Sequence, residues 1–198
     1  MEHYFSENPS SSVKENSFPA LLRGKQILFF SSGGVFSKNE VDIGTKLLIE
    51  KCIMQDGWNV LDLGCGYGAV GVSIAKSFSG KVIMSDVNER ALLLSLKNLE
   101  LNSCRGEVIK SFVYDSLGKY KESFDTILAN PPQKAGKEIC FKMIDDAPLF
   151  LKKNGLLQIV ARPDIGGASL EKEIKKVFGN CEKIAEKGEF AVYAGMKK

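Results

Sequence analysis

The chain contains 198 residues, of which 44% are hydrophobic and 26% are charged, and its 27 Lys and Arg residues against 24 Asp and Glu residues give a formal net charge of +3. A chain of this length can bury one hydrophobic core, so we expect one main domain. So small a positive charge excludes a protein held to nucleic acid mainly by its overall charge, and contact with a polyanion would need a local basic patch.

The cysteine and histidine content excludes several classes of site. The five cysteines are widely spaced without a Cys-x-x-Cys pair, which is typical of reduced intracellular thiols. The one histidine, His3, lies in a polar segment, which argues against zinc sites and against Ser–His or Cys–His catalytic pairs. No apolar run approaches the roughly 20 residues that span a bilayer. We therefore expect a cytoplasmic protein without a metal site or a membrane segment; no pattern indicates its oligomeric state.

The first part of the chain is predicted to form a small N-terminal extension. Residues 1–25 are rich in Ser, Asn and Pro and show no clear period, so we expect an arm that lies on the domain or is partly disordered. Two apolar runs within Ile27–Ser37 are separated by Ser31-Ser32-Gly33-Gly34, and this break predicts a hairpin. Residues Ile43–Ile53 have a helical pattern.

From Trp58 onward, short apolar runs alternate with helical stretches, the pattern of repeated βαβ units. This predicts a doubly wound α/β fold, in which a mostly parallel sheet carries helices on both faces. A three-residue turn separates the last two strands, so they should form an antiparallel hairpin. We expect residues 58–198 to form the core, with residues 1–57 packed on it. Beyond the first βαβ units, strands are predicted near Val108–Val113, Phe124–Ala129, Leu156–Ala161, Cys181–Glu186 and Phe190–Met196, and helices near Glu138–Leu151 and Ala168–Phe178.

A glycine-rich turn follows the first strand of the core. Residues Val60–Gly71 read VLDLGCGYGAVG and satisfy the dinucleotide fingerprint as Gly66-x-Gly68-x-x-Gly71, with Asp86 at the distance of a ribose-binding acid. Asp62 argues against a dinucleotide, because its carboxylate would repel a pyrophosphate and attract a cation. S-adenosylmethionine (AdoMet) offers an ammonium and a sulfonium and has no phosphate, and its ribose diol still needs an acid. Alternatively, the glycines are purely conformational and the Asp is a helix cap.

A third acid, Asp115, is predicted to end the next strand. There it would accept the exocyclic amine of adenine, helped by backbone groups of Ser116; its alternative role is that of a turn or cap residue. The predicted cofactor-binding residues are Asp62, Gly64, Cys65, Gly66, Asp86, Val87, Asp115, Ser116 and Asn130.

The strand FDTILA leads into Asn130-Pro131-Pro132-Gln133. The two prolines end the strand and fix the backbone, so the Asn130 side chain and the Pro131 carbonyl are held at the edge of the sheet. Together these oxygens can accept both hydrogens of a planar NH2 group and direct its lone pair toward a methyl group. We therefore predict Asn130, Pro131 and Pro132 as the catalytic residues. The alternative is an ordinary strand that ends at proline.

These motifs together resemble the class I AdoMet-dependent methyltransferases that modify amino nitrogens, and GVFSKNEVDIGTKLL and NPPQKAGKE resemble their methyltransferase small-domain family. The resemblance implies a seven-stranded, Rossmann-like fold. It also implies that Phe36, Ser37, Asp42 and Thr45 approach the cofactor, although Asp42 could simply cap a helix. Many relatives have an aromatic residue where this chain has Gln133, so stacking on a target base must come from elsewhere, for example from Phe36.

The resemblance implies methylation of an exocyclic amine of an RNA base, most specifically guanine N2 of ribosomal RNA. Lys134, Lys137 and Arg162 follow the acceptor motif or the next strand, and they could contact the phosphates of an extruded nucleotide. Three alternatives remain: a methyltransferase of protein glutamine amides, a non-catalytic RNA-binding domain with a vestigial cofactor loop, and a nicotinamide dehydrogenase. The dehydrogenase is disfavoured by Asp62 and by the lack of a downstream catalytic His or Tyr-Lys set.

Overall fold

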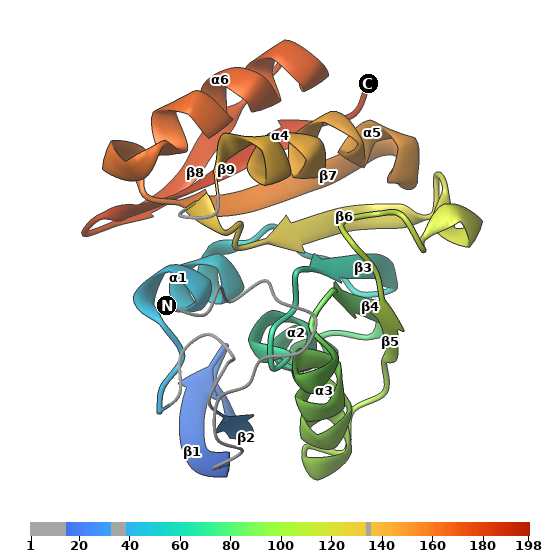
Figure 1. The fold of residues 1–198 in the computed structure, drawn as a ribbon, viewed down its shortest axis with the longest axis vertical. Coiled ribbons are helices and arrows are strands. Elements are labelled where there is room, and N and C mark those ends of the chain that lie inside the picture. The colour runs from blue at the N-terminus through green and yellow to red at the C-terminus, as the bar shows by residue number, and fades with distance from the viewer. Residues whose placement is uncertain (1–14, 33–38, 134–135) are drawn as a thin grey trace.

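The fold is built around one seven-stranded sheet in the order β5-β4-β3-β6-β7-β9-β8 (Figure 1). The structure, a computed structural model, describes residues 15–32, 39–133 and 136–198. Each neighbouring pair among strands β3 to β7 is parallel, whereas β9 is antiparallel to both β7 and β8. This confirms the predicted doubly wound, mostly parallel sheet with its antiparallel C-terminal hairpin. The strands are β3 (Trp58–Leu63), β4 (Gly80–Asp86), β5 (Glu107–Lys110), β6 (Phe124–Ala129), β7 (Leu151–Ala161), β8 (Glu182–Lys187) and β9 (Phe190–Met196).

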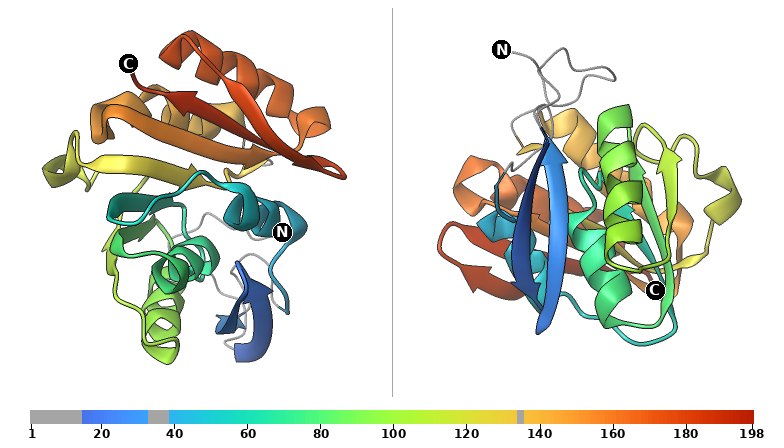
Figure 2. Two further views of the ribbon diagram at one scale, coloured as in Figure 1. Left: turned by 180° about the vertical axis from the view of Figure 1, so that it is seen from behind. Right: turned by 90° about the horizontal axis from the view of Figure 1, so that it is seen from below.

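Helices cover both faces of the sheet (Figure 1, Figure 2): α1, α2 and α3 lie on one face, and α4, α5 and α6 on the other. Successive strand residues point to opposite faces, so Val60 packs into the core on the first face and Leu61 into the core on the second. None of the described helices is long and apolar enough to cross a membrane. The helices are α1 (Ile43–Lys51), α2 (Ala69–Ser77), α3 (Glu89–Leu101), α4 (Lys137–Asp145), α5 (Ala147–Phe150) and α6 (Gly167–Phe178), with short 3-10 turns η1 (Gly118–Tyr120) and η3 (Pro163–Ile165).

The strand order reverses at β3, and this reversal places a crevice at one edge of the sheet. From β3 the chain moves outward to β4 and β5, and then returns to form β6 on the other side of β3. The connection after β3 leads to α2 on one face, and the connection after β6 leads to α4 on the other. Because these connections diverge, the carboxyl ends of β3, β4 and β6 border an open space, where doubly wound folds bind ligands.

The N-terminal hairpin differs from the prediction in its position. Strand β1 (Glu15–Leu22) pairs antiparallel with β2 (Lys25–Ser32), so a strand replaces the described last part of the expected arm, and the predicted break at Ser31 and Ser32 lies in the buried end of β2. The turn consists of Arg23 and Gly24, whose φ angles of 47° and 70° are the left-handed values that a two-residue hairpin turn requires. Gly33 and Gly34 lie outside the described residues.

Other boundaries also differ from the prediction, and β7 begins at Leu151, before the predicted start near Leu156. Strand β5 ends at Lys110 and not near Val113, because the chain turns there: Val113 has a φ of 49°, and the Ser111 hydroxyl donates to its carbonyl at 3.0 Å. The single helix predicted for Glu138–Leu151 is two helices, α4 and α5. Pro148 lies in the first turn of α5, where proline is tolerated, but it could not continue α4.

Two asparagines, Asn98 in α3 and Asn102 at its C-cap, bind the backbone of β2 as a neighbouring strand would. The Asn98 side chain accepts from the backbone N–H of Phe30 at 2.7 Å and donates to its carbonyl at 2.9 Å. One turn later, Asn102 accepts from Leu28 at 3.0 Å and donates to its carbonyl at 2.8 Å. Asn98 also donates to the Tyr67 carbonyl in the glycine loop, at 2.8 Å. Helix α3 thereby joins the hairpin to the loop that borders the crevice.

We expect Asn98→Ala to lower the free energy of unfolding by about 3 kcal/mol, because it leaves the buried Tyr67 carbonyl and the part-buried N–H and carbonyl of Phe30 without this partner. Asn180→Ala is the matched control: Asn180 forms the same pair of bonds with the backbone of Met196, but that pair is exposed, and its loss should cost less than about 1 kcal/mol. Urea unfolding of the two variants measures the difference, and equal losses would contradict this role of Asn98.

Candidate active site

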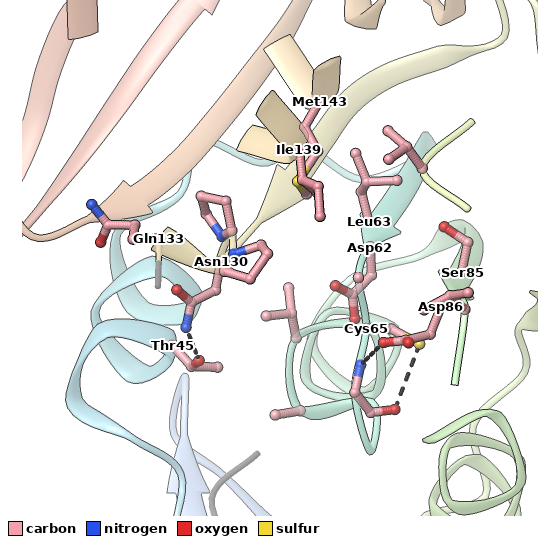
Figure 3. A pocket seen from close by; sticks show the side chains of 18 of the residues that line it. Thr45, Asp62, Leu63, Cys65, Ser85, Asp86, Asn130, Gln133, Ile139 and Met143 are labelled. Carbon is pink, nitrogen blue, oxygen red and sulfur yellow. Dashed lines mark hydrogen bonds between the residues drawn. The ribbon is translucent and has the colours of Figure 1, made fainter. Parts of the chain in front are cut away.

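A pocket of about 420 Å³ lies at the crevice between the carboxyl ends of β3, β4 and β6 (Figure 3). One half is bordered by the glycine loop and the end of β4, and includes Asp62 and Asp86. The other half is bordered by the start of α1 and the segment after β6, and includes Thr45 and Asn130. The pocket thus joins the predicted cofactor loop to the predicted acceptor motif.

The glycine loop approaches the sheet more closely than other residues would allow. A Cβ atom on Gly71 would lie 2.2 Å from the sulfur of Met84, so only glycine fits there without a shift. This close approach lets the Gly71 N–H donate to Asp62 Oδ2 at 2.8 Å. Three further glycines of the loop have left-handed φ angles, which favour glycine: Gly64 at 74°, Gly66 at 57° and Gly68 at 87°.

Asp62 is a buried carboxylate without a cation beside it among the described residues. Its side chain is 2% exposed, and the Gly71 N–H is the hydrogen-bond donor the structure gives it. Burial raises the pKa of Asp62 to about 7, and the negative charge of Asp86 adds to this effect. In Figure 3, Asp62 lies between Asn130 and Asp86. A ligand that brings a positive charge to this point would stabilise the ionised carboxylate.

Asp86 ends β4, as predicted, and is held rigidly. Its two oxygens accept from the backbone N–H groups of Gly66 and Asn88, each at 2.9 Å, while burial raises its pKa. Next to it, the Ser85 hydroxyl is buried and has no hydrogen-bond partner among the residues that the structure describes. Val87, another predicted residue, also lines the pocket. Two acids and an unpartnered hydroxyl around a glycine cradle fit a ligand with a cation and a diol.

Cys65, which the sequence placed among the cofactor-binding residues, lines the pocket as a protonated thiol. Burial raises its pKa well above the ordinary value, and the charges of Asp86 and Asp62 add to this. Its sulfur lies 3.5 Å from the Ser95 hydroxyl. Cys65 therefore contributes shape to the glycine loop and no charge. The described residues contain no group of three or more metal-ligating side chains.

Asp115 and Ser116 do not lie where they were predicted. Because β5 ends at Lys110, Asp115 is not at a strand end; its side chain is 59% exposed and lies 3.7 Å from the Lys142 ammonium. Neither Asp115 nor Ser116 is among the residues that line the pocket. The chain turns into the pocket earlier than the prediction assumed, and its wall there is formed by Ser111, Phe112 and Val113.

The Asn130 side chain contacts a residue from the N-terminal part of the chain. Its Nδ2 donates to the Thr45 hydroxyl at 2.8 Å (Figure 3). Asp42 is the N-cap of α1, as the alternative interpretation held, and it also lines the pocket. Pro131 and Pro132 line the pocket as well, and the Pro131 carbonyl accepts the N–H of Gln133 at 2.9 Å. One lone pair of this carbonyl is thereby used and the other remains.

The Gln133 side chain turns away from Asn130 (Figure 3). It accepts the backbone N–H of Arg162 at 2.8 Å and donates to the carbonyls of Arg162 and Ile165, at 3.2 and 2.9 Å. These hydrogen bonds connect the acceptor motif to the turn after β7. Arg162 lines the pocket, where its guanidinium is paired with Asp164 and Glu189.

An aromatic residue that the sequence did not point to also lines the pocket. Phe190, the first residue of β9, lies so close to Gly44 that a Cβ atom there would come within 2.6 Å of its ring. Only the contact across the fold reveals it, since Phe190 looks like an ordinary strand residue. Phe36, Ser37 and Lys134 lie outside the described residues, and Lys137 is an exposed residue at the start of α4.

Residues 26–194 match the family described as the methyltransferase small domain. YbxB of Bacillus subtilis, itself uncharacterised, is 35% identical over 99% of this chain and 98% of its own length. Ribosomal RNA small subunit methyltransferase C of Photorhabdus laumondii is 35% identical over 83% of this chain, which spans 48% of that relative.

Two solved structures show the same architecture. A 16S rRNA N2 methyltransferase of T. thermophilus, in complex with AdoMet and guanosine, is similar with a TM-score of 0.85 and 26% identity, over 96% of this chain and 52% of that one. A methyltransferase from Pyrococcus furiosus shares the fold, with a TM-score of 0.64 and 21% identity over 73% of this chain and 77% of its own.

The raised pKa of Asp62 predicts how stability depends on pH. Between about pH 4 and pH 7 the folded protein keeps the Asp62 proton that the unfolded chain releases, so stability falls as the pH rises through this window. Asn cannot bind or release this proton, so we expect the stability of the Asp62→Asn variant to fall less as the pH rises through this window. Denaturant unfolding at pH 5 and pH 8 tests it, with the exposed Asp56 replaced by Asn as a control that keeps the wild-type slope. Parallel pH profiles for wild type and Asp62→Asn would refute it.

Proposed function

The chain belongs to the methyltransferase small-domain family, and from this membership we propose that it methylates an exocyclic amino nitrogen of an RNA base, guanine N2 of ribosomal RNA. It is an AdoMet-dependent methyltransferase. The observation that carries the proposal is the Asn130 side chain, whose amide nitrogen is bound to Thr45, so that its oxygen is left for an amino group in the pocket.

We assign the cofactor to the half of the pocket around the glycine loop. When bound, AdoMet supplies an electrophilic methyl group: the acceptor nitrogen forms a bond to the methyl carbon as the carbon–sulfur bond breaks, which leaves the methylated amine and S-adenosylhomocysteine and releases a proton to solvent. Asp62 would pair with the ammonium group, and Asp86 would accept from the ribose diol. Gly64 and Gly66 leave room for these contacts. The pocket wall of Ser111, Phe112 and Val113 would contact the adenine in place of Asp115 and Ser116.

We assign the acceptor to the other half of the pocket. Asn130 Oδ1 and the second lone pair of the Pro131 carbonyl would accept the two hydrogens of a planar amino group, which aims its lone pair out of the plane. Both oxygens are held before the acceptor arrives, Asn130 by Thr45 and the Pro131 carbonyl by Gln133. No general base is needed before attack, because the methylated product loses its proton readily.

A planar ring would find an apolar surface beside these oxygens. Phe190, Pro132 and Ile165 line the pocket there, and Arg162 borders it with its charge partly neutralised by two acids. Phe190 can therefore stack on a base in place of the aromatic residue that this chain lacks at position 133. An RNA acceptor is supported by the relatives that are named for ribosomal RNA methylation, although the chain spans only about half of their length.

We expect Asn130→Ala to lower methyl transfer to ribosomal RNA by at least about 100-fold, because an oriented hydrogen-bond group in the transition state is lost. AdoMet binding, measured by calorimetry, should stay within about threefold of wild type. Asn180→Ala, remote from the pocket, is the control and should keep full activity. Full residual activity of the Asn130 variant would refute its catalytic role.

The acceptor is tested by treating RNA and proteins from a strain that lacks the protein with labelled AdoMet. We expect the label in small-subunit ribosomal RNA, and nucleoside mass spectrometry should find N2-methylguanosine. Another methylated nucleoside would overturn the assignment to guanine N2. Label in protein glutamine residues would support the alternative acceptor, whose amide is also a planar NH2 group.

A further inference from the structure

The contact between Thr45 and Asn130 joins residues 85 positions apart in the chain, at the point where the acceptor is expected. We propose that Thr45 is a positioning residue: its hydroxyl binds the amide nitrogen of Asn130 and thereby holds the side chain with its amide oxygen toward the acceptor amine. This inference rests on the proposed function, and it adds a residue outside the cofactor loop and the Asn-Pro-Pro motif to the machinery of the reaction.

The two ends of an asparagine amide have nearly the same shape and opposite hydrogen-bonding character. With Oδ1 toward the pocket, Asn130 accepts a hydrogen of the acceptor amine. After a half-turn of the amide, the NH2 group would face another NH2 group, and two donors cannot bond to each other. Pro131 fixes the backbone of Asn130 but does not distinguish these two orientations of its side chain. A separate contact must therefore hold the side chain in the productive orientation.

The Thr45 hydroxyl supplies this contact. It accepts from Nδ2 of Asn130 at 2.8 Å, which directs Oδ1 to the opposite side, and it is held firmly because Thr45 is 6% exposed. The backbone of Thr45 is fixed in turn, since its N–H donates to Asp42 Oδ1 at 3.1 Å in the N-cap of α1. The ring of Phe190 packs against Gly44, directly before Thr45. The first turn of α1 thus behaves as a fixed support for the hydroxyl.

The test compares Thr45→Val, which keeps the shape and removes the hydroxyl, with Thr45→Ser, which keeps the hydroxyl. We expect Thr45→Val to lower kcat on ribosomal RNA by about 10- to 100-fold while KM for RNA and Kd for AdoMet change less than threefold. Thr45→Ser should retain kcat within about threefold. Should Thr45→Val fold poorly, Thr45→Ala gives the same comparison, and circular dichroism identifies the folded variants.

Thr126→Val is the matched control. Thr126 is also a buried threonine whose hydroxyl accepts from a side-chain amide, that of Gln158, at 2.9 Å, but this pair lies within the sheet and does not line the pocket. Its loss should lower thermal stability and leave kcat unchanged. A drop in kcat of equal size in both Val variants would mean that any lost buried hydroxyl impairs the enzyme, and would overturn the proposal.

A double-mutant cycle separates this proposal from the proposed function. If Thr45 acts through Asn130, then Thr45→Val should cause no further loss in a protein that already carries Asn130→Ala. Additive losses, or a Thr45→Val variant with wild-type kcat, would overturn the role of Thr45 while Asn130 remains catalytic. Wild-type activity of Asn130→Ala would instead refute the proposed function itself.

Discussion

The reversal of strand order at β3 is the constraint on which the whole site depends. Because β4 and β6 flank β3 on opposite sides, the carboxyl ends of three parallel strands border one crevice, and each delivers a different group there: Asp62 from β3, Asp86 from β4 and Asn130 after β6. Two buried carboxylates so close together are unfavourable without a cation. The fold therefore keeps in place a charge arrangement that a cationic cofactor would complete, directly beside the group that would hold its acceptor.

The sequence predicted those parts of the structure that local patterns encode. The ends of β6 and β9 agree residue by residue with the prediction, because Pro131 stops one strand and a Gly188 turn precedes the other. Asp86 and Asn130 lie in the pocket for the same reason: Asp86 ends a short buried strand and Asn130 directly follows one. Contacts between distant segments were beyond such patterns. The chain turns at Val113, which has a positive φ, so Asp115 does not lie at the strand end where it was expected. No sequence pattern near Phe190 predicts its contact with Gly44.

The N-terminal part of the chain reaches both halves of the pocket, although it precedes the parallel sheet in the sequence. Rings of the hairpin surround Tyr67 of the glycine loop, with Phe29 at 5.5 Å and Phe18 at 6.0 Å between ring centroids, both edge-on. Helix α1 contributes Thr45 to the acceptor side. The division into residues 1–57 and 58–198 stays a prediction. These contacts indicate that the first segment is required for the shape of the site and does not merely cover the core.

The position of Gln133 has a consequence for how this site could diverge. An aromatic side chain after the two prolines would offer a base a stacking surface, but it could not form the three hydrogen bonds that join Gln133 to the turn after β7. That turn carries Arg162 and Ile165, both of which line the pocket. A residue at position 133 thus cannot both stack on a base and form the hydrogen bonds that hold the turn after β7. An aromatic residue at position 133 would therefore have to be accompanied by a change in the turn after β7, whose backbone groups would otherwise lose these hydrogen bonds.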